Sequence, residues 1–268
     1  MLNLLSKQAV LFVASTIVAS HAVAADAPVL TCMGTREPGV PAVILEAGAG
    51  NGVEAWAKIQ PAIAKFARVC AYDRPGLRRY WKDDEPPAAP TPDTVVDTLE
   101  RALTNAGERP PYVLVGHSYG GMIVRLFAGQ YPDRIRGVVL IDSSHEDQMR
   151  RFGDPPPVTP PPGASGVVVN LPEAIDLVAM SDALRARPWR TTASLLVLTR
   201  GNAGAAKPPT PPDAAAVARY QIWLELQREL ATRSTVAEQV IAKQSGHFIQ
   251  NDEPQLVIDG IRRMLESK

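Results

Sequence analysis

The sequence is poor in cysteine and histidine and carries no excess of charge of either sign. Its 268 residues include 2 cysteines, too few for a disulfide-dense scaffold or a four-thiolate zinc site. The 4 histidines form no ligand-spaced set, so we expect neither a metal nor a cofactor. Lys and Arg number 28 and Asp and Glu number 28, which argues against nucleic acid or an acidic membrane surface as a partner. With 46% hydrophobic residues, the chain is long enough for one large globular domain.

The longest apolar run lies near the N-terminus, in the pattern of a secretory signal peptide. A single charge, Lys7, precedes the apolar residues 9–19, and the tripeptide 22–24 (AVA) matches the A-x-A cleavage pattern. A membrane anchor is the alternative, but the run is shorter than the roughly 20 residues that span a bilayer. We therefore expect residues 1–24 to be removed, and the mature chain 25–268 to be secreted or periplasmic without stable membrane insertion.

Short apolar runs alternate with helical patterns along the rest of the chain. The runs that we expect to be strands are 42–45, 68–72, 112–115, 137–141 and 194–198. Each run is continuously apolar, which is typical of strands buried on both faces of a parallel sheet. Apolar residues at helical spacing predict helices over 53–66, 94–106, 122–129 and 254–265. This alternation predicts an α/β fold with a mostly parallel, doubly wound sheet covered by helices.

Proline is abundant, with 25 residues that concentrate in three segments. The segments are 86–92, 155–162 and 208–212. The second lies within a long insertion, 143–193, between two expected strands. Insertions of this length are usually functional, so we expect a cap or lid, the alternative being a cap without influence on substrate choice. Its apolar residues are Phe152, Val167, Val168, Val169, Leu171, Ile175, Leu177 and Met180.

The pentapeptide 116–120 (GHSYG) carries the strongest chemical signal. It matches G-x-S-x-G, follows the expected strand 112–115 and precedes the expected helix 122–129. Glycines on both sides of Ser118 permit a sharp strand-to-helix turn that exposes the hydroxyl at a helix N-terminus. The context predicts a nucleophile elbow with Ser118 as the nucleophile, the alternative being a glycine-rich turn with a bystander serine.

A serine nucleophile requires a base and an acid. His247, near the C-terminus, is the expected base; His145 is the alternative, and His117 is expected to point away from the serine hydroxyl. Asp142, at the end of the strand after the elbow, is the expected acid that orients the imidazole. Asp213, beyond a proline run, is the alternative acid.

An oxyanion hole is expected where small residues follow the first buried strand. The loop 46–52 (EAGAGNG) would let backbone N–H groups approach a substrate oxygen. We expect one donor to be the N–H of Tyr119, the residue after the nucleophile, and the other to be the N–H of Ala49.

Together these motifs resemble the α/β-hydrolase superfamily, in its compact serine esterase and aminopeptidase-like forms. The matching segments are 43–50, 72–76, 116–121 and 245–247, which span most of the mature chain. The resemblance implies hydrolysis of a carboxylic ester, or a related acyl bond of a small molecule, through a Ser-His-Asp triad and an acyl-enzyme. Many members have His-Gly where this chain has Ala47 and Gly48, and many carry the acid after the strand that corresponds to 194–198. The pair Asp73 and Arg74 resembles a recurrent motif that we interpret as structural.

The same residues are compatible with other functions. An amide hydrolase of the aminopeptidase-like kind or an acyltransferase would use the same triad. A non-catalytic small-molecule binding protein would keep the scaffold alone. Gly48, Gly50, Gly52 and Asp73 approach a dinucleotide-binding fingerprint, but its third glycine should stand where Val53 stands.

The two cysteines complete the comparison with the superfamily. The segment 30–33 around Cys32 resembles the strand that precedes the expected strand 42–45, which leads into the loop of the oxyanion hole. Cys70 lies on the expected strand that follows 42–45. In the superfamily's strand order these two strands are neighbours, and side chains in register on neighbouring strands can meet disulfide geometry. We therefore expect a Cys32–Cys70 disulfide, the alternative being two buried thiols.

Overall fold

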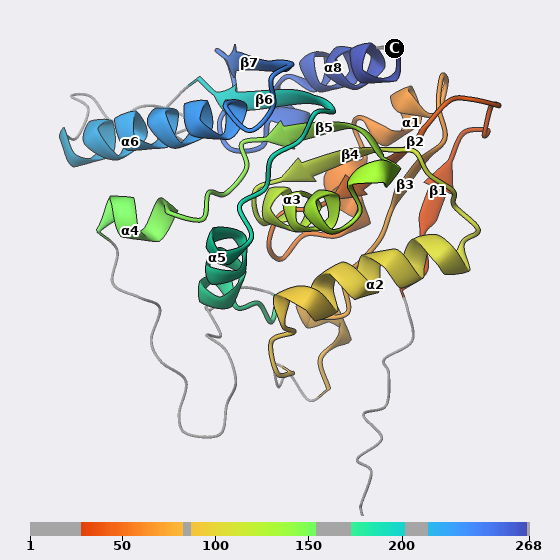
Figure 1. Ribbon diagram of the computed structural model, residues 1–268, viewed down its shortest axis with the longest axis horizontal. Coiled ribbons are helices and arrows are strands. Elements are labelled where there is room, and N and C mark those ends of the chain that lie inside the picture. The colour runs from red at the N-terminus through yellow and green to blue at the C-terminus, as the bar shows by residue number, and fades with distance from the viewer. Residues whose placement is uncertain (1–27, 83–86, 154–172, 202–213, 267–268) are drawn as a thin grey trace, which may run out of the picture.

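The computed structural model describes residues 28–82, 87–153, 173–201 and 214–266. Within them, seven strands form one sheet in the order β1-β3-β2-β4-β5-β6-β7 (Figure 1). The strands are β1 Thr31–Met33, β2 Ala42–Glu46, β3 Val69–Ala71, β4 Tyr112–His117, β5 Ile135–Ile141, β6 Ser194–Arg200 and β7 Ala237–Ala242. Strand β1 pairs antiparallel with β3, and the other pairs are parallel. The predicted α/β class with a mostly parallel sheet is confirmed.

Helices cover both faces of this sheet. The α-helices are α1 Gln60–Ile63, α2 Pro92–Asn105, α3 Tyr119–Gln130, α4 Gln148–Phe152, α5 Leu177–Ala186, α6 Ala214–Ala231, α7 Ile249–Asp252 and α8 Pro254–Glu266. The described residues also form the 3₁₀ helices η1 Val53–Trp56, η2 Arg78–Tyr80 and η3 Pro132–Arg134. Alternate strand residues point to opposite faces: Ile44 and Leu114 pack with α2 and α3, whereas Val43 and Val115 pack with α1 and α8. Two apolar cores therefore hold the strand ends in fixed positions.

One helix differs from its prediction. The continuous helix expected over 53–66 is wrong, because the structure has η1 followed by the short α1. Pro61 lies in the first turn of α1, where its missing N–H costs nothing; further inside a helix its ring would clash with the preceding turn. Helix α2 begins at Pro92, before the expected start at 94: Thr91 caps it by accepting from the N–H of Thr94, and Pro92 is tolerated in the first turn.

A disulfide joins the edge strand β1 to its neighbour β3. Cys32 on β1 lies directly opposite Cys70 on β3 in the antiparallel register, and the two sulfurs are bonded. The bond predicted for these cysteines is present in the structure. It closes a loop across a sequence separation of 38.

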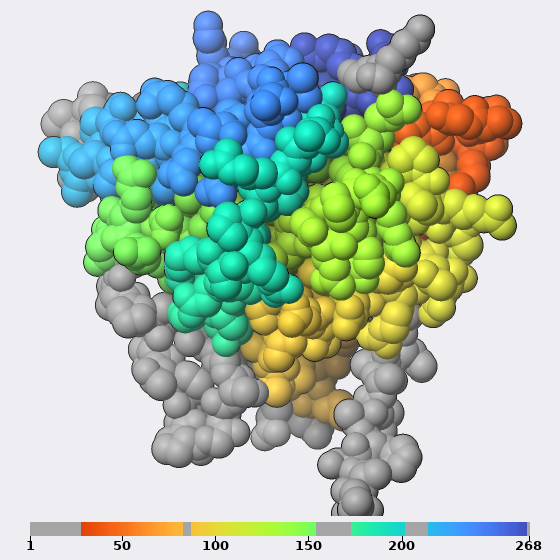
Figure 2. Space-filling model, viewed as in Figure 1, coloured from red at the N-terminus to blue at the C-terminus, as the bar shows by residue number. Residues whose placement is uncertain are grey.

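The insertion 143–193 contributes α4, α5 and the segment that precedes α5. Helix α5 packs against α2 and α3, and α4 packs against α6 (Figure 2). The remainder of the insertion, with the second proline-rich segment and residues 167–169, lies outside the described residues, as do the leader 1–24 and the segment 208–212. None of the helices in the described ranges is both long and apolar enough to cross a bilayer.

Candidate active site

The elbow places Ser118 between β4 and α3. The backbone of Ser118 has φ 52° and ψ −119°, a strained conformation that few non-glycine residues adopt. A Cβ atom at Gly120 would clash with the carbonyl oxygen of Glu46, so only glycine lets α3 approach β2 this closely. The serine therefore stands at the N-terminus of a buried helix, whose dipole favours negative charge at that point.

The same corner holds Asp142 and His247. Asp142 follows β5, is fully buried and also has a positive φ of 42°. Its Oδ2 lies 2.6 Å from Nδ1 of His247, which stands in the loop between β7 and α7. The Ser118 N–H donates to the carbonyl of Ile141 at 3.1 Å, so the elbow is tied to the residue that precedes Asp142. The structure thus brings a carboxylate and an imidazole together beside the serine.

The serine hydroxyl itself makes no hydrogen bond within the described part of the chain. Such catalytic contacts commonly tighten only when a substrate is bound. The imidazole nitrogen facing Asp142 is Nδ1, so Nε2 is left to face a reacting group.

Arg200 and Trp223 hold the carboxylate of Asp142 from the other side. Arg200 Nη1 lies 2.6 Å from Oδ2, and Trp223 Nε1 donates to Oδ1 at 2.8 Å. The Arg200 guanidinium also stacks 4.4 Å from the centre of the Trp223 ring. Burial raises the pKa of Asp142, but the His247 hydrogen bond and the Arg200 charge outweigh it and hold that pKa below its usual range. Asp142 is therefore an ionised acceptor.

Sequence reasoning missed both of these partners. Arg200 ends β6, and many superfamily members carry the acid after this strand. The lack of an acid there was the sequence signal that a different kind of residue occupies this place. Trp223 lies on α6, a helix that is not among those predicted from the sequence. The alternative acid, Asp213, lies outside the described residues.

His117 lies between His247 and the loop 46–52, the oxyanion loop, in which an oxyanion hole is expected. Its Nε2 lies 2.9 Å from the carbonyl oxygen of His247, and since a carbonyl only accepts, this nitrogen carries the proton. Its ring centre is 4.6 Å from that of His247. Burial first, and then the charge of His247, lowers the pKa of His117 to about 3. The ring is therefore neutral and fixes the backbone of the loop that carries His247.

His145 is engaged elsewhere. Its Nδ1 accepts from the N–H of Asp147 at 3.0 Å, and its side chain is buried. Burial lowers the pKa of His145 to about 4. The geometry therefore pairs Asp142 with His247 and leaves His145 in a separate network with Glu146.

The loop after β2 presents its backbone toward the elbow. Arg74 binds the carbonyl oxygens of Ala47 at 2.7 Å and Gly48 at 2.8 Å. Among the described residues, no acceptor is bound by the N–H of Ala49 or of Tyr119. These two N–H groups are those that the sequence predicts for the oxyanion hole, and they are available for a substrate oxygen.

The dinucleotide-binding alternative finds no matching geometry here. The glycine-rich loop leads into the 3₁₀ helix η1 and not into an α-helix whose N-terminus could receive a pyrophosphate. Asp73 is already bound, since it accepts from the N–H of Val53 and the hydroxyl of Tyr80, both at 2.8 Å.

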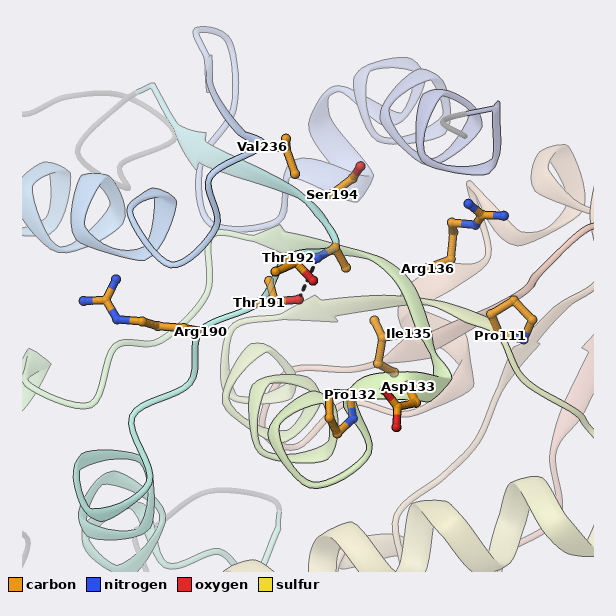
Figure 3. A pocket seen from close by; sticks show the side chains of 11 residues that line it. Pro111, Pro132, Asp133, Ile135, Arg136, Arg190, Thr191, Thr192, Ser194 and Val236 are labelled. Atoms are coloured by element: carbon orange, nitrogen blue, oxygen red, sulfur yellow. Dashed lines mark hydrogen bonds between the residues drawn. The ribbon is translucent and has the colours of Figure 1, made fainter.

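A surface depression of about 760 Å³ lies at the opposite end of the sheet. It is lined by residues at the amino ends of β5, β6 and β7, among them Ile135, Ser194 and Val236 (Figure 3). Arg136 and Arg190 extend to opposite sides of it in Figure 3, so they do not form one anion site. Ser118, Asp142 and His247 follow the carboxyl ends of β4, β5 and β7, so this depression is separate from the candidate site.

Comparison with known proteins identifies the family. A profile described as alpha/beta hydrolase fold matches residues 41–258, and the chain belongs to this family. The chain is 27% identical over 215 residues to the protein YqjL of Bacillus subtilis (strain 168), covering 80% of this chain and 79% of that one. It is 31% identical over 112 residues to an AB hydrolase superfamily protein of Gibberella zeae, covering 41% of this chain and 34% of that one.

Solved structures share the fold at lower identity. A thermophilic esterase from Thermogutta terrifontis has a TM-score of 0.58 and 18% identity, with 89% of this chain and 93% of that chain covered. The carboxylesterase CesB of Bacillus subtilis has a TM-score of 0.56 and 15% identity, with 88% of this chain and 86% of that chain covered. At such identities the likeness establishes the fold.

Proposed function

We propose that the protein is a serine hydrolase that cleaves carboxylic esters of small molecules. The observation that carries the proposal is the 2.6 Å contact between Asp142 and His247, beside a serine held on a strained elbow. An esterase and a carboxylesterase of the same fold support the reaction class. The roles are Ser118 as nucleophile, His247 as base and Asp142 as the acid that orients the base.

The reaction proceeds in two acyl transfers. The Ser118 oxygen attacks the carbonyl carbon while its proton passes to Nε2 of His247, and Asp142 stabilises the imidazolium. The N–H groups of Ala49 and Tyr119 bind the oxyanion. His247 then returns the proton to the leaving alcohol, and the acyl group remains on Ser118. In the second half, water gives a proton to His247 and its oxygen attacks the acyl carbon. The bond to the Ser118 oxygen then breaks, His247 returns the proton to that oxygen, and the acid is released.

Labelling and hydrolysis together test this proposal. The protein should react with a fluorophosphonate at Ser118, identified by peptide mass spectrometry, and should hydrolyse p-nitrophenyl esters. Turnover of aminoacyl p-nitroanilides instead would move the function to the aminopeptidase-like alternative, and ester formation with an added alcohol would move it to acyl transfer. Absence of both labelling and hydrolysis would leave a non-catalytic binding protein.

Single and double substitutions test whether the residues act as one unit. We expect Ser118→Ala and His247→Ala each to lower kcat by a factor on the order of 10⁴ or more, because each removes a group that the other needs. The double variant should be no slower than either single variant. A double variant that is much slower than both would contradict the proposed partnership.

A further inference from the structure

The buried arginine behind the oxyanion loop is bound by two carboxylates. Arg74 forms ion pairs with Glu46 at 2.6 Å and with Glu173 at 2.5 Å, and all three side chains are buried. Burial lowers the pKa of Arg74, but the two carboxylates outweigh it and raise that pKa well above its usual range. Glu46 comes from β2, whereas Glu173 comes from the insertion between β5 and β6.

This cluster fixes three consecutive peptide groups of the oxyanion loop. Arg74 binds the carbonyls of Ala47 and Gly48, which fixes the two peptide groups that they begin. The third peptide group, between Ala49 and Gly50, is held at both ends: Glu173 accepts from the Gly50 N–H at 2.7 Å, and the Asn51 side chain donates to the Ala49 carbonyl at 2.9 Å. In a trans peptide the carbonyl and the next N–H point in opposite directions, so the Ala49 N–H is directed away from Arg74.

The same cluster reaches the second oxyanion donor. The Arg74 guanidinium lies 5.5 Å from the ring centre of Tyr119, the residue whose N–H is the other donor. Glu173 is fixed in turn by its own backbone, because Ala174 N–H donates to the carbonyl of Gly76 at 2.9 Å and Glu173 bridges to Leu77. The insertion is thereby attached to the turn that carries Arg74.

We propose that Glu173, acting through Arg74 and the Gly50 N–H, is a positioning residue for the oxyanion hole. The inference rests on the proposed function, since an oxyanion forms only if acyl transfer takes place. It makes the insertion part of the machinery that stabilises the transition state. The carboxylate of Glu173 is bound by Arg74 and by the Gly50 N–H, so its effect on the reaction passes through them.

Glu173→Gln separates positioning from plain electrostatics. Glutamine keeps the shape but offers one acceptor oxygen and an NH₂ group, so either Arg74 or the Gly50 N–H faces a donor. If only charge mattered, removal of a buried negative charge near the oxyanion would speed the reaction. If Glu173 acts by positioning, the substitution should instead slow the reaction. Loss of one oxyanion donor lowers kcat by a factor of about 10²–10³, so a misdirected donor should cost about tenfold for Glu173→Gln and about a hundredfold for Arg74→Met.

The readouts are chosen so that a merely structural role would not move them. The Ki of a trifluoromethyl ketone, measured per fluorophosphonate-titrated site, should rise by the factor by which kcat/KM falls, while KM for a p-nitrophenyl ester stays within about threefold. The double variant Arg74→Met/Glu173→Gln should be no slower than Arg74→Met. The matched control is Glu108→Gln, which removes another buried carboxylate paired with arginines, Arg36 and Arg68, and should leave the Ki unchanged.

Amide hydrogen exchange keeps this inference distinct from the proposed function. Exchange of the Gly50 amide should accelerate in Glu173→Gln, because the glutamine either turns a donor toward that amide or loses a contact with Arg74 that fixes its side chain beside it. Faster exchange in a protein that neither labels nor turns over esters would overturn the proposed function and keep the loop assignment. An active Glu173→Gln enzyme with unchanged Ki and unchanged exchange would overturn the inference itself.

Discussion

At the scale of single residues, the carboxylate of Asp142 is bound by three other side chains of the candidate site. His247, Arg200 and Trp223 all contact its carboxylate. We expect Asp142→Asn to lower kcat about 10²–10⁴-fold, because an amide cannot hold the imidazole tautomer or stabilise the imidazolium. Kinetics per titrated active site would measure this effect without contamination from unfolded protein. Asp213→Asn should be close to wild type, and the reverse ranking would assign the acid to the proline-rich segment.

His117 predicts how stability depends on pH. Its pKa is about 3 in the folded protein, well below the ordinary value near 6.5, so below pH 6.5 the unfolded chain binds a proton that the folded protein does not. Stability should therefore fall as pH falls from about 6.5 to about 3, by up to about 1.4 kcal/mol per pH unit from this residue. For His117→Gln, the free energy of unfolding should be measured in urea at pH 7, 6 and 5. Its dependence on pH should be less steep than in the wild type, by up to the equivalent of one bound proton. Parallel slopes for variant and wild type would show that His117 is not responsible.

The residues that sequence reasoning could find are those with a local signal. Ser118 has its glycine flanks, Asp142 ends a continuous apolar run, and His247 is one of few histidines. Arg200 contacts Asp142 across 58 positions, and Glu173 contacts Arg74 across 99. Such pairs depend on which strand ends and loops become neighbours in space, and no spacing within the sequence records that.

At the scale of elements, continuous burial made the central strands predictable. β2, β4, β5 and β6 lie inside the sheet, and each contains a short continuous run of buried apolar residues. The edge strand β7 was missed because it includes Glu238 and Gln239 and is only partly buried. Helix α6 was missed although Trp223, Leu226 and Leu230 recur at helical spacing, which was the signal for it.

Two glycines of helix α3 give opposite predictions. A Cβ at Gly120 would clash with the backbone of β2, whereas a Cβ at Gly129 meets only a Trp189 ring carbon at ordinary contact distance, 3.6 Å. We expect Gly120→Ala to destabilise the fold by more than about 2 kcal/mol, since overpacking against backbone cannot be relieved by side-chain movement. Gly129→Ala should be neutral or stabilise by up to about 1 kcal/mol, because alanine favours the helix. Urea denaturation measures both, and equal effects would contradict the close approach of α3 to β2.

At the scale of the whole molecule, the sheet is bounded by two unlike edges. β7 ends one side without a covalent link, whereas β1 on the other side is three residues long and only partly buried. A strand this short forms few ladder hydrogen bonds and buries little apolar surface, so it contributes weakly to its own attachment. The Cys32–Cys70 bond attaches β1 covalently to β3.

The disulfide therefore makes a prediction about global stability. Closing a loop over a separation of 38 residues should stabilise the fold by roughly 3–4 kcal/mol, because the bond restricts the unfolded chain. We expect Cys32→Ser/Cys70→Ser to lower the free energy of unfolding by that amount, and reduction of the wild type to have the same effect. Mass spectrometry of the alkylated, non-reduced protein provides the control: two alkylated cysteines after oxidative folding would show that the bond does not form. If the bond is present but the oxidised protein and the double variant unfold at the same urea concentration, β1 is held by its packing alone.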